Sequence, residues 1–184
     1  MKSIASLALA LLGLSAAAPA AHASSYALLG IGPKAGVNGD LGNNVDGDTR
    51  ALRFGLGQRI GPVALEGSLF GADLIGTGGN SFAVDHEFST LSFGLDLKGF
   101  ISVLGPVELF GKAGLNQTWI MGEGNDMNGP GWDLGAGAQF VLDVEFGYAA
   151  IWADFTHQRV GLSDGDRDVD GGINMIMVGA SLGL

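Results

Sequence analysis

The chain has 184 residues, enough for one domain but short for a two-domain enzyme. Hydrophobic residues make up 47% of it and charged residues 15%, against a usual charged share of about 25%, which excludes a disordered, highly charged chain. The 9 basic and 19 acidic residues give a formal net charge of −10, which argues against a nucleic-acid partner. The 33 glycines follow no Gly-X-Y period, and the absence of cysteine excludes disulfides and a thiol nucleophile.

The first 23 residues have the pattern of a secretory signal peptide. Lys2 gives a positive start, an apolar run follows from Ile4 to Leu14, and Ala21-His22-Ala23 matches the A-x-A cleavage pattern. The apolar run is about half of the ~20 residues that a membrane-spanning helix needs. We therefore expect cleavage after Ala23. The remaining domain, 24–184, then has eight basic and nineteen acidic residues, a formal net charge of −11.

Apolar residues alternate with polar or small ones at period two through the rest of the chain, which is the pattern of β-strands. In chain order the predicted strands are 26–35, 50–60, 63–72, 91–101, 107–115, 132–140, 144–153 and 173–184. Each has roughly ten residues, the length with which a tilted strand crosses a bilayer.

Short and long connections alternate strictly between these predicted strands. The short ones are 61–62, 102–106 and 142–143, and the long ones are about 36–49, 73–87, 120–131 and 157–172. Short periplasmic turns and long extracellular loops are typical of bacterial membrane barrels. The sequence therefore predicts an all-β fold, an eight-stranded antiparallel up-and-down transmembrane β-barrel with both termini on the periplasmic side.

The two faces of the predicted strands differ in character. One face carries charges of mixed sign in mid-strand: Arg53, Arg59, Glu66, Asp96, Lys98, Glu108 and Lys112. It also collects small residues: Gly55, Gly57, Gly94, Gly114, Gly135, Gly137 and Gly147. Because eight strands leave an interior only wide enough for side chains, we expect this face to fill the lumen with ion pairs. The apolar face would then contact lipid, with Trp119, Trp132, Tyr148 and Trp152 pointing outward. The alternative is a soluble sheet whose charged face is solvated.

The chain ends in a strand of alternating apolar residues, from Ile176 to Leu184. Together with the leader and the loop pattern, this resembles the small eight-stranded outer-membrane β-barrels of Gram-negative bacteria, the OmpA/OmpX-like group, over about 24–184. The resemblance implies recognition of the last strand by the barrel-assembly machinery. The chain departs from the family in its last residue, which is usually Phe in the family and here is Leu184.

Lipid A deacylases resemble this architecture and carry a His-x-Ser pair near the end of a late strand. Here the residues are His157-Gln158-Arg159, and an arginine cannot attack an ester. Ser163 lies too far along the chain to share the geometry of that pair. We expect His157 to be a strand-end residue at the outer interface, and His86, in the second long loop, has no partner that spacing identifies. No catalytic residue and no cofactor site is predicted.

The fourth long loop contains half of a calcium-binding motif. Asp164 to Gly171 includes the D-x-D-x-D-G opening, but the twelfth position, counted from Asp166, is Met177 where a bidentate Glu is needed. A solvated loop tip is the simpler hypothesis, and loose binding of divalent cations is the alternative.

Three classes of function follow from these predictions. The first is an integral outer-membrane barrel with a structural or cell-surface interaction role, in contact with outer-membrane lipid and lipopolysaccharide. The second is a narrow porin-like channel for small solutes, and the third is a soluble periplasmic lipocalin-like binder. The sequence names no extracellular partner.

Overall fold

The computed structural model describes residues 23–39, 45–46, 51–76, 87–121, 127–145 and 147–184. These residues form eight long strands: β1 Ala23–Gly39, β3 Ala51–Ile60, β4 Val63–Gly76, β5 Glu87–Leu104, β6 Val107–Met121, β7 Met127–Val144, β8 Gly147–Ser163 and β9 Asp168–Gly183. A two-residue strand, β2 Val45–Asp46, pairs with the end of β4. Among the described residues no helix is long and apolar enough to cross a membrane.

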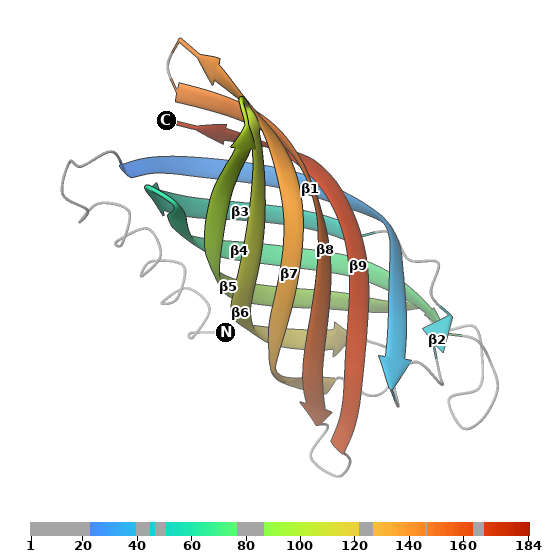
Figure 1. Cartoon of the computed structure of the whole chain (residues 1–184). Coiled ribbons are helices and arrows are strands. Elements are labelled where there is room, and N and C mark those ends of the chain that lie inside the picture. The colour runs from blue at the N-terminus through green and yellow to red at the C-terminus, as the bar shows by residue number, and fades with distance from the viewer. Residues whose placement is uncertain are drawn as a thin grey trace.

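The eight long strands close into a barrel (Figure 1). Each pairs antiparallel with its neighbour in the chain, and β1 completes the circle by pairing with β9. The register of the closing pair places Tyr26 opposite Gly183 and Ile31 opposite Val178, with an irregularity between Ile31 and Lys34. The predicted eight-stranded antiparallel up-and-down barrel is confirmed.

The strands extend further into the long connections than the sequence predicted. The β6–β7 hairpin stays paired as far as Ile120 and Met127, and the β8–β9 hairpin as far as Ser163 and Asp168. The predicted long loops at 120–131 and 157–172 are therefore wrong in extent, because most of their residues belong to strands. Backbone pairing continues in these hairpins although their Gly, Asn and Asp content is typical of loops.

The short turns lie at the opposite end of the barrel, together with the C-terminus (Figure 1). Gly61-Pro62 and Gly105-Pro106 form two of them, and the positive φ angles of Gly61 (58°) and Gly105 (53°) are conformations that glycine adopts without strain. The third short connection is 145–146 and not the predicted 142–143, because β7 continues to Val144.

Apolar side chains cover the outward face of the strands, as predicted for a membrane barrel, and the inward positions hold polar and charged side chains together with apolar ones such as Leu28, Phe70 and Phe110. The exposed apolar residues are spread over the strands and include Leu29, Ile31, Leu52, Phe54, Leu69, Leu95, Leu97, Leu115, Leu134, Ile151, Phe155, Ile176 and Leu182. The buried polar residues include Arg53, Glu66, Asp96, Lys98, Lys112, Asp133, Asp154 and Gln158. In water this distribution would leave most of the apolar surface unburied, so the barrel wall is suited to lipid.

The predicted facing of β8 is wrong. Trp152 is buried in the lumen with 6% of its surface exposed, and Tyr148 is partly buried against the same interior, whereas Ile151 is 66% exposed. Gly147 is exposed, on the same face of β8 as Ile151, and therefore points outward and not into the lumen. The prediction continued one alternation from Val144 across the connection at 145–146, and the alternation starts anew after that connection.

A cysteine scan of β8 tests this facing, because the chain has no native cysteine. Ile151→Cys should place a nitroxide label among lipid acyl chains, where lipid-soluble oxygen shortens its relaxation time. The matched variant Ala150→Cys, one residue away and 2% exposed, should give a label shielded from oxygen. The reverse pattern in the membrane-inserted protein would contradict the assignment.

Candidate functional site

The middle of the lumen holds a cluster of charged side chains contributed by five strands. Its members are Arg53 on β3, Glu66 on β4, Asp96 and Lys98 on β5, Lys112 on β6 and Asp154 on β8. Period-two alternation places all of them on the inner face of their strands. We call this group the central cluster.

Arg53 contacts three carboxylates of the central cluster. Its Nη2 atom lies 2.7 Å from Glu66 Oε1 and 2.9 Å from Asp96 Oδ2, and its Nη1 atom lies 3.3 Å from Asp154 Oδ2. Glu66 and Asp96 are directly opposite in the β4–β5 register, where two like charges repel. The Arg53 guanidinium bridges them and so offsets this repulsion.

The two lysines of the central cluster are also directly opposite each other, in the β5–β6 register. Each contacts a different carboxylate: Lys98 Nζ donates to Glu66, and Lys112 Nζ lies 3.0 Å from Asp154 Oδ2. The Tyr26 hydroxyl donates to Glu66 Oε2 at 2.8 Å. The cluster therefore connects β1, β3, β4, β5, β6 and β8 across the interior through charge-assisted hydrogen bonds.

Glycines on the inner face make room for these large side chains. A Cβ atom added at Gly135 would lie 2.6 Å from Lys112 Cε, one at Gly137 would lie 2.5 Å from Phe110 Cζ, and one at Gly114 would overlap Asp96. In each case the long side chain lies over a glycine of the neighbouring strand. This confirms that small residues collect on the lumen face because the interior is narrow.

The short-turn end of the lumen is closed by a second, separate ion pair. Arg59 on β3 binds Glu108 on β6 with two hydrogen bonds of 2.8 and 2.9 Å, and Gln139 donates to the same carboxylate at 2.7 Å. The Arg59 guanidinium also lies 4.2 Å from the ring centroid of Phe100. β3 and β6 are not neighbours in the sheet, so this pair spans the lumen.

The other half of the lumen changes from polar to apolar towards the long-connection end. Gln158 on β8 donates to Thr118 at 3.0 Å and to Ser92 at 3.3 Å. Beyond these residues the inward positions of β8 and β9 are Val160, Leu162 and Ile173, each at most 1% exposed. Side chains thus fill the interior on both sides of the central cluster.

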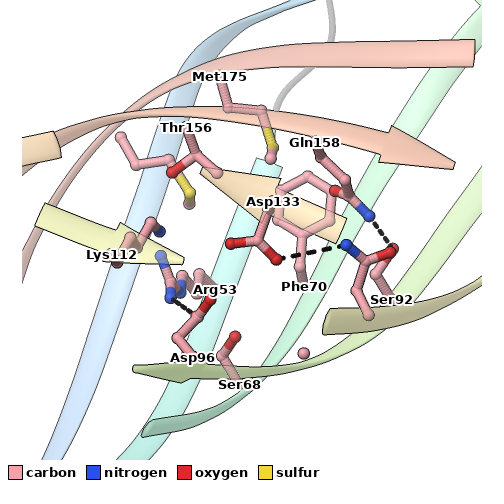
Figure 2. A pocket seen from close by; sticks show the side chains of 13 residues that line it. Arg53, Ser68, Phe70, Ser92, Asp96, Lys112, Asp133, Thr156, Gln158 and Met175 are labelled. Atoms are coloured by element: carbon pink, nitrogen blue, oxygen red, sulfur yellow. Dashed lines mark hydrogen bonds and ion pairs between the residues drawn. The ribbon is translucent and has the colours of Figure 1, made fainter. Parts of the chain in front are cut away.

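Little free volume remains inside the barrel in the part of the chain that the structure describes. The larger cavity has a volume of about 30 Å³ and lies beside Arg53, Asp96, Lys112 and Asp133 (Figure 2). The second, of about 10 Å³, lies beside Tyr26, Lys98 and Trp152. Such volumes hold one or two water molecules, so they do not form an aqueous pore.

Seven charged residues were predicted in the lumen, and all seven face the interior as expected: Arg53, Arg59, Glu66, Asp96, Lys98, Glu108 and Lys112. The carboxyl groups of Asp133 and Asp154 and the neutral hydroxyl of Tyr26 were not among the predicted members. Polar residues occupy every second position of this part of β8, at Asp154, Thr156 and Gln158, on the same face as Trp152. This pattern could have revealed that Asp154 faces the lumen.

The two residues of the candidate deacylase pattern lie on the outer wall of β8. His157 Nδ1 donates to Asn174 Oδ1 at 2.7 Å, and its ring centroid lies 5.7 Å from that of Trp132. Arg159 is exposed, 3.9 Å from Asp170. Ser163 lies six residues beyond His157, about 20 Å along an extended strand, so β8 does not bring the two together. His86 lies outside the described residues.

The half calcium motif lies only in part within the described residues. Residues 164–167 lie outside the described residues. Asp168 and Asp170 belong to β9, paired with Ser163 and Gly161, and Met177 is buried in the lumen. Among the described residues no group of three metal-ligating side chains is found.

Three solved structures of bacterial outer-membrane proteins resemble this barrel. Neisserial surface protein A has a TM-score of 0.62 at 14% identity, with 87% of this chain and 96% of that chain covered. A major outer membrane protein from Thermus thermophilus has 0.58 at 11%, covering 89% and 100%. Ail from Yersinia pestis, in complex with sucrose octasulfate, has 0.53 at 17%, covering 87% and 98%.

No protein-family model matches the sequence, and no curated protein matches it. The structural likeness therefore defines the fold, which is that of the small eight-stranded outer-membrane β-barrels. The predicted resemblance to the OmpA/OmpX-like group is confirmed at this level.

Replacing Arg53 by methionine tests the central cluster. Arg53→Met leaves Glu66, Asp96 and Asp154 without a shared cation, and breaking a buried ion pair in this way costs about 3–5 kcal/mol of unfolding free energy. The measurement is urea unfolding of the refolded barrel, followed by tryptophan fluorescence. The exposed control Arg159→Met should cost about 0–1 kcal/mol. Equal losses in the two variants would contradict the role of Arg53.

Proposed function

We propose that this chain is an integral outer-membrane protein, exported by a cleaved leader, that acts at the cell surface as a structural or interaction barrel without catalytic activity. The observation that carries the proposal is the inverted distribution of its side chains. Apolar residues cover the outer wall, and paired charges occupy the middle and the short-turn end of the lumen. Membrane lipid is the solvent in which such a wall is stable.

The partners proposed for the barrel follow from its outer surface. Outer-membrane lipid and lipopolysaccharide would contact the wall, where Trp132 and His157 lie next to the apolar Leu134 at the side facing the long connections. Aromatic and polar side chains in such a position are typical of a membrane interface. The barrel-assembly machinery would bind β9, whose outward residues Ile176, Val178 and Leu182 form an apolar row.

The long-connection end is the surface that we propose to face outward from the cell. The segments that connect the long strands there, 40–50, 77–86, 122–126 and 164–167, contain eight acidic and two basic residues in the sequence. Such a charge favours cationic partners and repels polyanions. The sulfated sugar bound in the Ail structure is a polyanion, so we do not propose an equivalent ligand for this chain.

The second candidate is a narrow channel, and the cavity beside Arg53 is the observation in its favour. Against it, the central cluster and the Arg59–Glu108 pair block the lumen at two levels. A soluble lipocalin-like binder is disfavoured because such a barrel turns its apolar face inward.

A charge on the outer wall tests the membrane proposal. Leu97 is 58% exposed in the middle of the outward apolar run of β5, and Leu104 is 77% exposed at its end. In a membrane, Leu97→Arg should cost about 2–4 kcal/mol of folding free energy and Leu104→Arg about 0–1 kcal/mol. Folding into lipid vesicles is followed by the gel shift between unheated and heated samples. A soluble barrel would tolerate both changes equally and would not require lipid or detergent.

Conductance in planar bilayers separates the surface-interaction barrel from the channel. The inserted wild type should carry no steady current, because two layers of paired charges close its interior. The double variant Arg59→Ala/Glu108→Ala removes the short-turn layer only and should stay closed, since the central cluster remains. Insertion is verified on gels first, and a steady ohmic current in the verified wild type would favour the channel.

A further inference from the structure

The charges in the middle of the lumen do not balance. Beside the three cations of the central cluster, Arg53, Lys98 and Lys112, there are four carboxyl groups: Glu66, Asp96, Asp133 and Asp154. Each of the seven residues is at most 7% exposed. An ionised carboxylate without a cation partner is strongly unfavourable in such an interior, and a buried group in this situation usually gives up its charge.

Asp133 is the carboxyl group of the four that has no cation within ion-pair distance among the described residues. Glu66, Asp96 and Asp154 each lie within ion-pair distance of Arg53. Asp133 instead accepts a hydrogen bond from the neutral amide of Asn116, at 3.3 Å to its Oδ2 atom. Its other oxygen, Oδ1, is buried and has no hydrogen-bond partner.

The register places Asp96 and Asp133 on either side of a glycine. Asp96 on β5 is opposite Gly114 on β6, and Gly114 is opposite Asp133 on β7. Because Gly114 has no side chain, Asp96 Oδ1 lies over it and so extends from β5 across β6 towards the strand that carries Asp133. The Oδ1 atom of Asp96 is the second buried carboxyl oxygen without a partner.

We infer that Asp96 and Asp133 form a proton-binding site in the lumen, in which one proton is shared between their two carboxyl groups across Gly114. A carboxylic acid donating to a carboxylate gives both orphan oxygens a partner in a single hydrogen bond. The shared proton also leaves three negative charges to face three positive ones. The charged layer in the middle of the lumen is then electrically neutral.

The groups around the pair agree with a proton and disfavour a metal cation. Arg53 Nη2 already lies 2.9 Å from Asp96 Oδ2, so a further cation at this carboxyl would be repelled. Lys98 on β5, the strand of Asp96, is one ionisable group near the pair. The others come from neighbouring strands: Tyr26 on β1, Arg53 on β3, Glu66 on β4, Lys112 on β6 and Asp154 on β8. β9 contributes only Met175 and Met177 to this cavity.

Asp133→Asn is the variant that tests the shared proton. The asparagine amide can donate to Asp96 Oδ1 while its oxygen still accepts from Asn116, so it imitates the protonated carboxyl without being able to titrate. At pH above about 4 the unfolded chain ionises both aspartates, whereas the native wild type retains one proton. The wild-type unfolding equilibrium constant should therefore rise about tenfold per pH unit relative to that of the variant. This relative rise ends where the native pair loses its proton.

The measurement is urea unfolding of the refolded chain in detergent at a series of pH values. Asp154→Asn is the matched control, because it also replaces a buried aspartate but one that contacts Arg53 and Lys112. Near pH 4 it should raise the unfolding equilibrium constant by roughly a hundredfold or more, whereas Asp133→Asn should change it by less than about tenfold at that pH. Parallel pH dependences in wild type and Asp133→Asn would overturn the inference.

Infrared spectroscopy of the wild type provides a second test that does not depend on a variant folding. At neutral pH, where exposed carboxyls are ionised, the shared proton should give a carbonyl band of a protonated acid. The band should be retained in Asp154→Asn and lost in Asp133→Asn. Its absence from the wild type, or its persistence in Asp133→Asn, would overturn the inference. So would a wild-type stability that follows added sodium or calcium and not pH, since the occupant would then be a metal cation.

Discussion

The pairing of charge inside a lumen too narrow for a water-filled channel is the constraint on which this structure depends. Arg53 satisfies three carboxylates from three different strands, and each of those strands must hold its register for the contacts to form. A one-residue slip in any of them would turn the charged side chain towards lipid and bring an apolar one inside. The cluster is expected to do more for the choice of register than for the total stability, because desolvation offsets much of the attraction between buried charges.

The filled interior has a consequence for where function can be located. The larger cavity, beside Arg53, has room for only one or two water molecules, so the lumen enclosed by the described strands offers no volume for a substrate. The outer wall is apolar and suited to lipid. The connections between strands therefore remain as the surface on which partners can be distinguished, and at the long-connection end they carry most of the excess negative charge in the sequence.

Sequence patterns predicted the fold well because one physical rule, period-two alternation, controls both faces of every strand. They were wrong where alternation starts anew, as at Trp152, whose lipid-facing position was predicted by continuing the alternation of Val144 across a short connection. The sequence indicates that most of these charged residues face the lumen, but it does not indicate which of them form ion pairs with each other. Arg53 and Asp154 are 101 residues apart and meet only because β1 and β9 close the barrel.

The glycines of the lumen face connect these observations. Where a large inward side chain stands on one strand, as at Lys112, Phe110 or Asp96, the facing position of the next strand is Gly135, Gly137 or Gly114. An added methyl group at those positions would meet the large side chain or backbone atoms, so the glycines determine where each charged group lies as much as its partners do. Gly114 has a further effect, because it lets two carboxyl groups approach that a side chain would keep apart. The arrangement of charged groups in this lumen thus depends on glycines, which carry no side-chain functional group.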